Sequence, residues 1–189
     1  MPGRFPQFTL EDTREGEQRA LAERLLRETR AGLGGPWNVM LRSPRMGAAL
    51  VDLYNHFRRT TPVPQAMVEF AILITARECD APFEWLVHYP IAVQLGVDAA
   101  ILADVRVGRR PASMPPLAGA VYEFTVQLLR THFVTDATFA AASEALGEQG
   151  VVDLTALVGT YYAIGGLLNV AEVAVPDGDG PDRLPLKAR

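Results

Sequence analysis

Three ionisable side chains lie where the surrounding sequence is apolar: Glu69, Glu84 and His88. Glu69 interrupts the run 67–74, whose other residues are all apolar, while Glu84 and His88 stand four residues apart in the stretch 83–89. A charge buried among such neighbours must be paired, hydrogen-bonded or neutralised, because burying it alone is costly. Two carboxylates and an imidazole that lie close together can transfer protons. The three residues therefore indicate acid–base chemistry.

Each of the three residues also has a purely structural interpretation. Glu69 can form a buried ion pair with a cation such as Arg77 or Arg42, or face solvent at the edge of its helix. The spacing of Glu84 and His88 places them on one face of a helix, where the carboxylate can orient the imidazole and raise its pKa. The same spacing also suits a surface ion pair of little value to stability. The residues alone leave both interpretations open.

Metal binding is the third interpretation of these residues, because histidine and carboxylate side chains are both common metal ligands. The sequence has neither the HExxH nor the ExxH spacing, and the other histidines, His56 and His132, are remote. We therefore expect no metal ion and no other cofactor.

The chain has a single cysteine, Cys79, which excludes an internal disulfide and a CxxC redox pair. A small, buried side chain is the simpler interpretation of this residue. A reactive thiol would need a nearby cation or a helix N-terminus, and a predicted helix start at Pro82 keeps that interpretation open.

These residues must be positioned by helices, because no segment shows the period-2 alternation of a strand. The predicted helices cover 10–30, 44–59, 65–78, 82–95, 99–105, 117–132, 135–147 and 151–173, and Asp98 is the expected cap of the helix over 99–105. Thr9 is the expected N-cap of the first helix, and Pro90 predicts a kink or break near His88 in the fourth. The predicted fold class is all-α.

The 189 residues suffice for one domain with a sizeable core. We expect a flexible, Pro-rich lead over 1–8, a single all-α domain over 9–175, and a disordered tail rich in Gly, Pro and Asp over 176–189. A net charge of −4 without a basic cluster gives no support for nucleic-acid binding. The most apolar stretch, 154–175, contains polar residues, and the first residues have no signal-peptide core. We expect a cytoplasmic protein with no membrane partner.

Several segments, spread over residues 33 to 173, together resemble the carboxymuconolactone decarboxylase family, which shares its fold with the AhpD-type alkylhydroperoxidases. They are Leu-Gly-Gly-Pro-Trp-Asn at 33–38, Ser-Pro at 43–44, Val-Glu-Phe-Ala-Ile-Leu-Ile-Thr-Ala-Arg at 68–77, Phe-Glu-Trp-Leu-Val-His at 83–88, and Gly-Thr-Tyr-Tyr at 159–162 with Asn169. The resemblance implies an AhpD-like helical bundle that assembles as a trimer or a hexamer, with its site near a subunit interface.

The peroxidase branch of that family uses a CxxC pair on the helix of the family histidine and a glutamate from the preceding helix. By the family spacing, Glu69 matches the glutamate and His88 the histidine, whereas Ala81 and Glu84 stand at the two cysteine positions. Disulfide-based peroxide reduction needs an attacking thiolate and a resolving partner, and this pair is missing. The decarboxylase branch needs no thiols: a γ-lactone acid loses carbon dioxide, and a proton is delivered to the resulting dienolate-like carbon.

The resemblance implies a cofactor-free acid–base lyase (a decarboxylase) or isomerase that acts on a small lactone or cyclic acid. His88 would deliver or remove the proton, Glu84 would orient and charge the ring, and Glu69 would be the second acid–base group or stabilise the cationic ring. Candidate substrate-binding residues follow from their positions: the pocket walls Phe83, Trp85 and Tyr161, and Arg77 for a substrate carboxylate.

Two alternatives remain at this point. One is a peroxidase-like activity through Cys79. The other is a non-catalytic, oligomeric binding protein on a degenerate enzyme scaffold, in which Glu69 and His88 make only structural hydrogen bonds.

Overall fold

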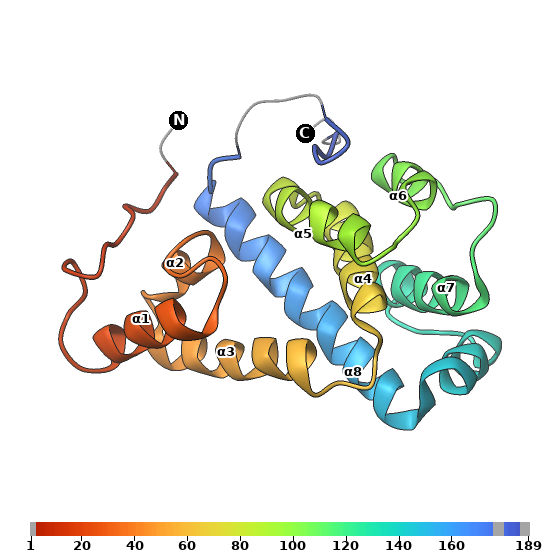
Figure 1. The fold of residues 1–189 in the computed structure, drawn as a ribbon, viewed down its shortest axis with the longest axis horizontal. Coiled ribbons are helices and arrows are strands. Elements are labelled where there is room, and N and C mark those ends of the chain that lie inside the picture. Colours follow the sequence, from red (N-terminus) through yellow and green to blue (C-terminus); the bar gives the residue numbers. More distant parts are fainter. Residues whose placement is uncertain (1–2, 176–179, 186–189) are drawn as a thin grey trace. The chain divides into compact units, whose positions relative to one another are not determined.

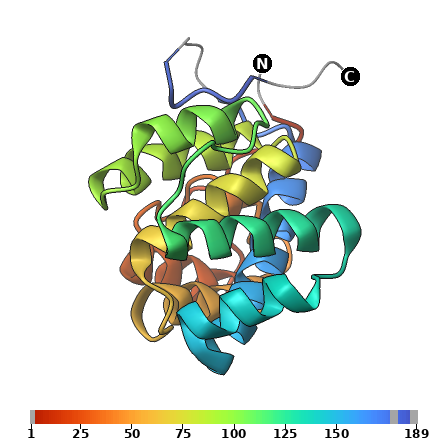
Figure 2. The ribbon, with the colours of Figure 1, turned by 90° about the vertical axis from the view of Figure 1, so that its right-hand side faces the viewer.

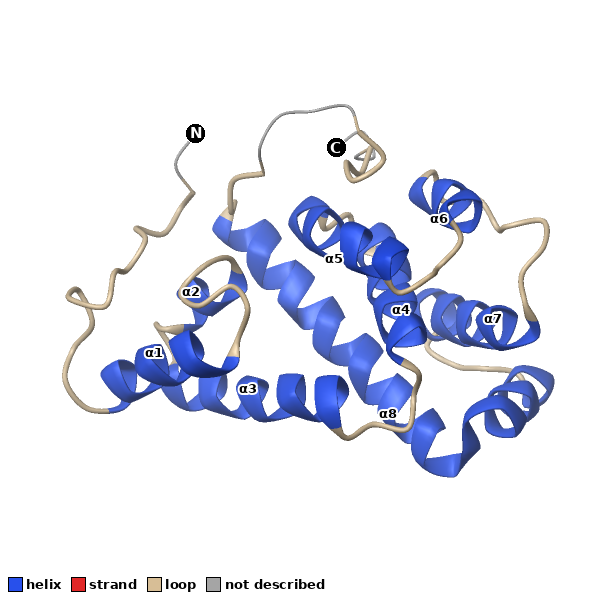
Figure 3. Cartoon of the chain, viewed as in Figure 1, coloured by secondary structure: helices blue, strands red, loops and turns tan. Residues whose placement is uncertain are grey.

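The structure is a computed structural model that describes residues 3–175 and 180–185. These residues form eight α-helices and no strand, which confirms the all-α prediction (Figure 3). The helices follow one another with short connections (Figure 1). The chain divides into two compact units: unit 1 comprises Met1–Thr60 and Gly166–Ala174, and unit 2 comprises Thr61–Gly165 and Val175–Arg189.

Unit 1 is built on α3 (Pro44–Arg59), which packs against α1 (Glu17–Glu28) and the short α2 (Pro36–Met40). Its core includes Leu21 and Leu25 from α1 and Val51 from α3. Gly47 permits the close approach of α1 and α3, because a Cβ atom there would lie 2.6 Å from a methyl group of Leu21.

The first helix begins at Glu17, so the prediction of a start at Leu10 with Thr9 as N-cap is wrong. The backbone N–H and the hydroxyl of Thr9 both donate to the carboxylate of Asp12, at 2.8 Å. Such local bonds from side chain to backbone offer the chain an alternative to the helix, which explains the later start.

Residues 3–8 of the predicted flexible lead are held within unit 1. The amide of Asn38 pairs with the backbone of Phe8 in both directions, at 3.0 and 2.9 Å. The Arg42 guanidinium lies over the rings of Phe5 and Phe8, 4.6 and 4.5 Å from their centroids. Residues 1 and 2 lie outside the described residues.

Unit 2 is built around α4 (Gln65–Glu78), whose bounds match the prediction. Figure 2 shows α4 with α5 (Pro82–Gln94) on one side and α7 (Pro116–Thr131) on the other, and it packs against both and against α6 (Ala99–Arg106). Every residue from Val68 to Arg77 is buried, so α4 is covered on all sides.

Of the predicted kink or break near His88, the break does not occur, since α5 continues through Pro90 to Gln94. Proline removes only one helical hydrogen bond, and packing against α4 keeps the remaining turns in place. The predicted cap of the next helix is confirmed, because the Asp98 carboxylate accepts a hydrogen bond from the backbone N–H of Ala100 at 2.8 Å.

The two helices predicted over 135–147 and 151–173 are joined in α8 (Asp136–Ala171), which carries residues of both units. Gly147 interrupts the helical backbone with φ 71° and ψ 173°, so the predicted boundary survives as a kink. By length and composition, α8 is long and apolar enough to cross a membrane. This is weak evidence, because the core helix of a soluble protein passes the same test. In α8, 50% of the most apolar 18-residue stretch is buried inside the protein. The cytoplasmic location stays a prediction, as does the single domain over 9–175.

Part of the predicted disordered tail lies against helices of unit 2, to which it also belongs. Residues 180–185, the C-terminal segment from here on, make hydrogen bonds to side chains of α4, α5 and α6. The rest of the predicted tail, 176–179 and 186–189, lies outside the described residues.

Candidate acid–base site

The structure brings Glu69, Glu84 and His88 together between α4 and α5. The imidazole Nδ1–H of His88 donates to Oε2 of Glu69 at 2.6 Å, and Nε2 lies 3.1 Å from Oε2 of Glu84. The three residues are only 0%, 3% and 7% exposed, in the order Glu69, Glu84 and His88. We call this arrangement the triad.

The local sequence explains how the triad forms. Glu84 lies in the first turn of α5, and His88 follows four residues later on the same face. Glu69 lies in the buried stretch of α4, and α4 and α5 pack closely together. A carboxylate there has little access to water, so the imidazole supplies the partner that its burial demands.

The surroundings of His88 have opposing effects on its pKa. Burial lowers the pKa, but the hydrogen bonds and negative charges of Glu69 and Glu84 outweigh it and raise the pKa to about 9. The ring is therefore an imidazolium at neutral pH, with each N–H directed at a carboxylate. A buried group that holds a proton so firmly can act as a proton donor, and it can act as a base only after that proton has left.

Tyr161 is the candidate pocket residue that lies directly on the triad. Its ring, which belongs to α8, meets the His88 ring edge-on, with 5.3 Å between centroids and an interplanar angle of 90°. Tyr161 is buried, whereas its neighbour Tyr162 is exposed.

Two of the other predicted substrate-binding residues, Trp85 and Arg77, contact the C-terminal segment. Trp85 is fully buried, stacks on Tyr89 with 6.1 Å between centroids, and donates its indole N–H to the carbonyl of Pro181 at 3.0 Å. Arg77 forms an ion pair with Asp80 at 3.3 Å and donates to the carbonyl of Pro185 at 2.6 Å. Phe83 is half-buried in the first turn of α5. Substrate binding by these residues stays a prediction.

Cys79 follows the last residue of α4 and packs against α8. A Cβ atom added at Gly165 would lie 2.9 Å from its Sγ. Burial, and to a smaller extent the negative charges of nearby carboxylates such as Glu84, raise the pKa of the thiol to about 11. The nucleophilic thiolate is therefore scarce at neutral pH.

Among the described residues, no group of three His, Cys, Asp or Glu side chains is arranged to hold a metal ion. In the triad, both ring nitrogens of His88 face carboxylates, and a protonated nitrogen has no lone pair for a metal.

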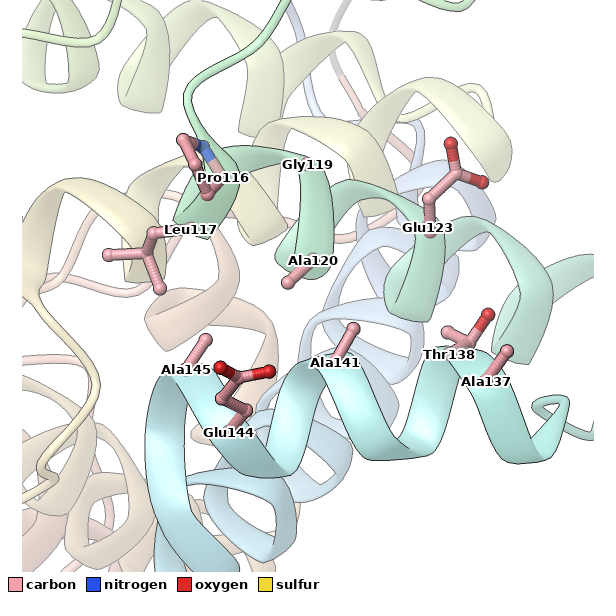
Figure 4. A pocket seen from close by; sticks show the side chains of 10 residues that line it. All are labelled: Pro116, Leu117, Gly119, Ala120, Glu123, Ala137, Thr138, Ala141, Glu144 and Ala145. Atoms are coloured by element: carbon pink, nitrogen blue, oxygen red, sulfur yellow. The ribbon is translucent and has the colours of Figure 1, made fainter.

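A pocket of about 650 Å³ lies in unit 2, between α7 and the first half of α8 (Figure 4). Most of its lining side chains are small or apolar, and its ionisable groups are Glu123 and Glu144. The residues that line it are Pro116, Leu117, Gly119, Ala120, Glu123, Ala137, Thr138, Ala141, Glu144 and Ala145. None of the residues predicted to act in the site belongs to this lining.

Sequence reasoning missed Arg106, whose Nε–H donates to the carbonyl of Arg183 at 2.5 Å. It also missed the C-terminal segment as part of this region. No sequence signal could have found these contacts, because the acceptors are backbone carbonyls, which every residue possesses.

The chain matches no protein-family model, and no curated protein matches it in sequence. The resemblance to the carboxymuconolactone decarboxylase family therefore rests on the residues quoted from the sequence. The chemistry of the site rests on the triad.

Proposed function

We propose that the triad is the acid–base centre of a cofactor-free lyase or isomerase, which acts on a small lactone or cyclic acid and resembles 4-carboxymuconolactone decarboxylase. The observation that carries this proposal is the buried His88 ring, each of whose nitrogens faces a carboxylate. The raised pKa of the ring agrees with it. The match of Glu69 and His88 to a family glutamate and histidine supports it from the sequence.

In the proposed decarboxylation, the bond between the substrate carboxylate and its neighbouring carbon breaks and carbon dioxide leaves. The electron pair stays on that carbon as a dienolate. His88 then delivers its proton to the carbon, and the neutral imidazole regains a proton from water. No oxidant, metal or organic cofactor enters this balance.

The two carboxylates have different roles in the proposal. The sequence-based expectation gave the orienting role to Glu84. Glu69 has the shorter contact, at Nδ1, and is the more deeply buried, so in the proposal Glu69 fixes the orientation of the ring and stabilises its charge. Glu84 faces Nε2 at the longer distance of 3.1 Å, so this nitrogen is the one that can release its proton to a substrate. Arg77 would bind the substrate carboxylate, and Phe83, Trp85 and Tyr161 would line the pocket.

The proposal extends to assembly and location. We propose that the protein self-associates as a trimer or hexamer, as the family resemblance implies, and that it acts in the cytoplasm on a small-molecule substrate. Light scattering coupled to size-exclusion chromatography measures the mass directly. A monomer at micromolar concentration would contradict the proposed assembly.

A non-catalytic binding protein is the second candidate, because the triad is almost completely buried and both ring nitrogens of His88 are engaged. In that case the triad would only stabilise the fold. A peroxidase-like activity through Cys79 is less favoured, since burial keeps this thiol protonated.

Turnover of a panel of γ-lactone acids, followed by carbon dioxide release, tests the proposal. His88→Gln and Glu69→Gln should each lower kcat at least 100-fold, the scale of general acid–base catalysis, while circular dichroism shows an intact helical fold. Cys79→Ser is the matched control and should keep full activity. Full activity in both triad variants would refute the proposal, and loss of activity in Cys79→Ser would favour the peroxidase alternative.

A further inference from the structure

Three side chains from three different helices hold the C-terminal segment by its backbone. Arg77 of α4, Trp85 of α5 and Arg106 of α6 donate to the carbonyls of Pro185, Pro181 and Arg183, respectively. The acceptors belong to alternate residues, and the side chain of Leu184 between two of them is buried. The segment therefore presents a row of carbonyls to α4, α5 and α6 and buries one apolar side chain.

Two of the three donors are buried while the segment is in place, and Arg106 is half-buried. Trp85 is 0% and Arg77 6% exposed, and a buried indole N–H needs an acceptor. Nε of Arg77 is also buried and has no hydrogen-bond partner. Removing the segment would leave the Trp85 and Arg77 donors without these acceptors, so the region suits a ligand that offers carbonyl or carboxylate oxygens.

We propose that Arg77, Trp85 and Arg106 form a peptide-binding site, and that the chain's own C-terminal segment fills this site as a releasable ligand. Three hydrogen bonds and one buried leucine must offset the cost of ordering six residues. These contributions are of similar size. The bound and released forms are therefore both populated, and the balance between them is easily shifted.

Release of the segment uncovers Trp85 and Arg77. Arg77, which donates to the carbonyl of Pro185, is also the residue proposed to bind a substrate carboxylate. The segment would thus compete with the substrate for Arg77. This consequence rests on the proposed function, whereas the binding of the segment does not.

Tryptophan fluorescence measures the binding in the full chain. The chain has two tryptophans, so a Trp37→Phe background leaves Trp85 as the sole reporter. In this background, Leu184→Asp should release the segment and raise the acrylamide quenching constant of Trp85 several-fold. Leu184→Met, which keeps an apolar side chain of similar volume, is the matched control and should leave quenching low.

A synthetic peptide of residues 176–189, added to the Leu184→Asp protein, should restore low quenching in a saturable manner. The same peptide with Leu184→Asp should not. Arg106→Gln in the protein should weaken peptide binding at least threefold. Unchanged quenching in Leu184→Asp with the native circular dichroism spectrum, or peptide affinity that Arg106→Gln leaves unchanged, would overturn the proposal. Because none of these readouts uses enzymatic activity, failure here is distinguishable from failure of the proposed acid–base function.

Discussion

The triad and the α7–α8 pocket are both in unit 2, but they differ in what they offer to chemistry. The triad concentrates three ionisable groups in the interior, whereas the pocket offers about 650 Å³ lined mainly by small side chains. In the pocket, Glu123 pairs with Arg110 at 2.6 Å near the surface. The difference shows that a cavity need not contain the reactive groups of a protein. It also suggests that the buried groups contribute more to the free energy of unfolding than the groups that line the pocket.

This contrast has a physical cause. A buried ion pair is held together because each partner would be uncompensated without the other, so removing one is strongly destabilising. An exposed pair such as Arg110 with Glu123 contributes little, because water solvates both groups. Substitutions in the triad should therefore have large effects, and substitutions in the pocket should have small ones.

The largest effect is expected for His88→Ala, which leaves Glu69 and Glu84 facing each other without a cation. We expect the free energy of unfolding to fall by about 3–5 kcal/mol, the usual result of breaking a buried ion pair. Urea denaturation followed by circular dichroism measures the change. Glu123→Ala in the pocket is the matched control, expected within about 0.5 kcal/mol. Equal losses of unfolding free energy in the two variants would contradict the expected difference between the triad and the pocket.

The pH dependence of stability is the second test of the difference between the triad and the pocket. The folded pKa of His88, about 9, lies above its ordinary value of 6.5. The stabilisation from its proton is therefore fully present below pH 6.5 and is lost as pH rises through about 9. The loss is on the order of 3 kcal/mol.

Unfolding free energies measured between pH 6 and pH 10 (roughly the window in which the ring titrates) test this slope. The His88→Gln variant should show a much flatter profile, because it has no ring to titrate. The same slope in both proteins would mean that another group causes it.

The two carboxylates of the triad should differ in how much each contributes to the free energy of unfolding. Glu69→Gln removes the charge at the shorter, fully buried contact, so we expect a loss of about 2 kcal/mol, within the range for hydrogen bonds to charged groups. Glu84→Gln, at the longer contact, should cost about half as much. Thermal and urea unfolding of the two variants measure the difference. A larger loss in Glu84→Gln would reverse the roles assigned to the two residues.

The smallest effects are expected for glycine substitutions. Gly119 lines the pocket, and a Cβ atom there would meet nothing within 4 Å, so Gly119→Ala should stabilise the protein by about 0.5–1 kcal/mol through helix propensity. Gly165→Ala in α8 is the matched case, in which the new atom would lie 2.9 Å from Sγ of Cys79. It should destabilise the protein. Calorimetric Tm values that move in the same direction for both would show that local space does not decide the outcome.

Much of unit 2 could be predicted from the sequence because its signals are local. The apolar run around Glu69 and the prolines that flank it predicted α4, and the four-residue spacing predicted that Glu84 and His88 share a face. The contact of Glu69 with His88 was harder to predict from the sequence, because it depends on how α4 packs against α5. The resemblance to a known family supplied that expectation.

Other features were out of reach for physical reasons. The late start of α1 depends on a turn between Thr9 and Asp12 that competes with the helix. The contacts of the C-terminal segment use backbone carbonyls, which carry no residue code. The α7–α8 pocket arises from small side chains that are equally suited to close helix packing.

The central claim is that His88 is a buried, protonated acid between two carboxylates. A titration of its imidazole by ¹⁵N NMR, with the signal assigned by loss in His88→Gln, tests this claim most directly. We predict that both ring nitrogens stay protonated through neutral pH and that the ring titrates with a pKa of about 9. A neutral ring at pH 7, with a pKa at or below the ordinary value of 6.5, would contradict the account.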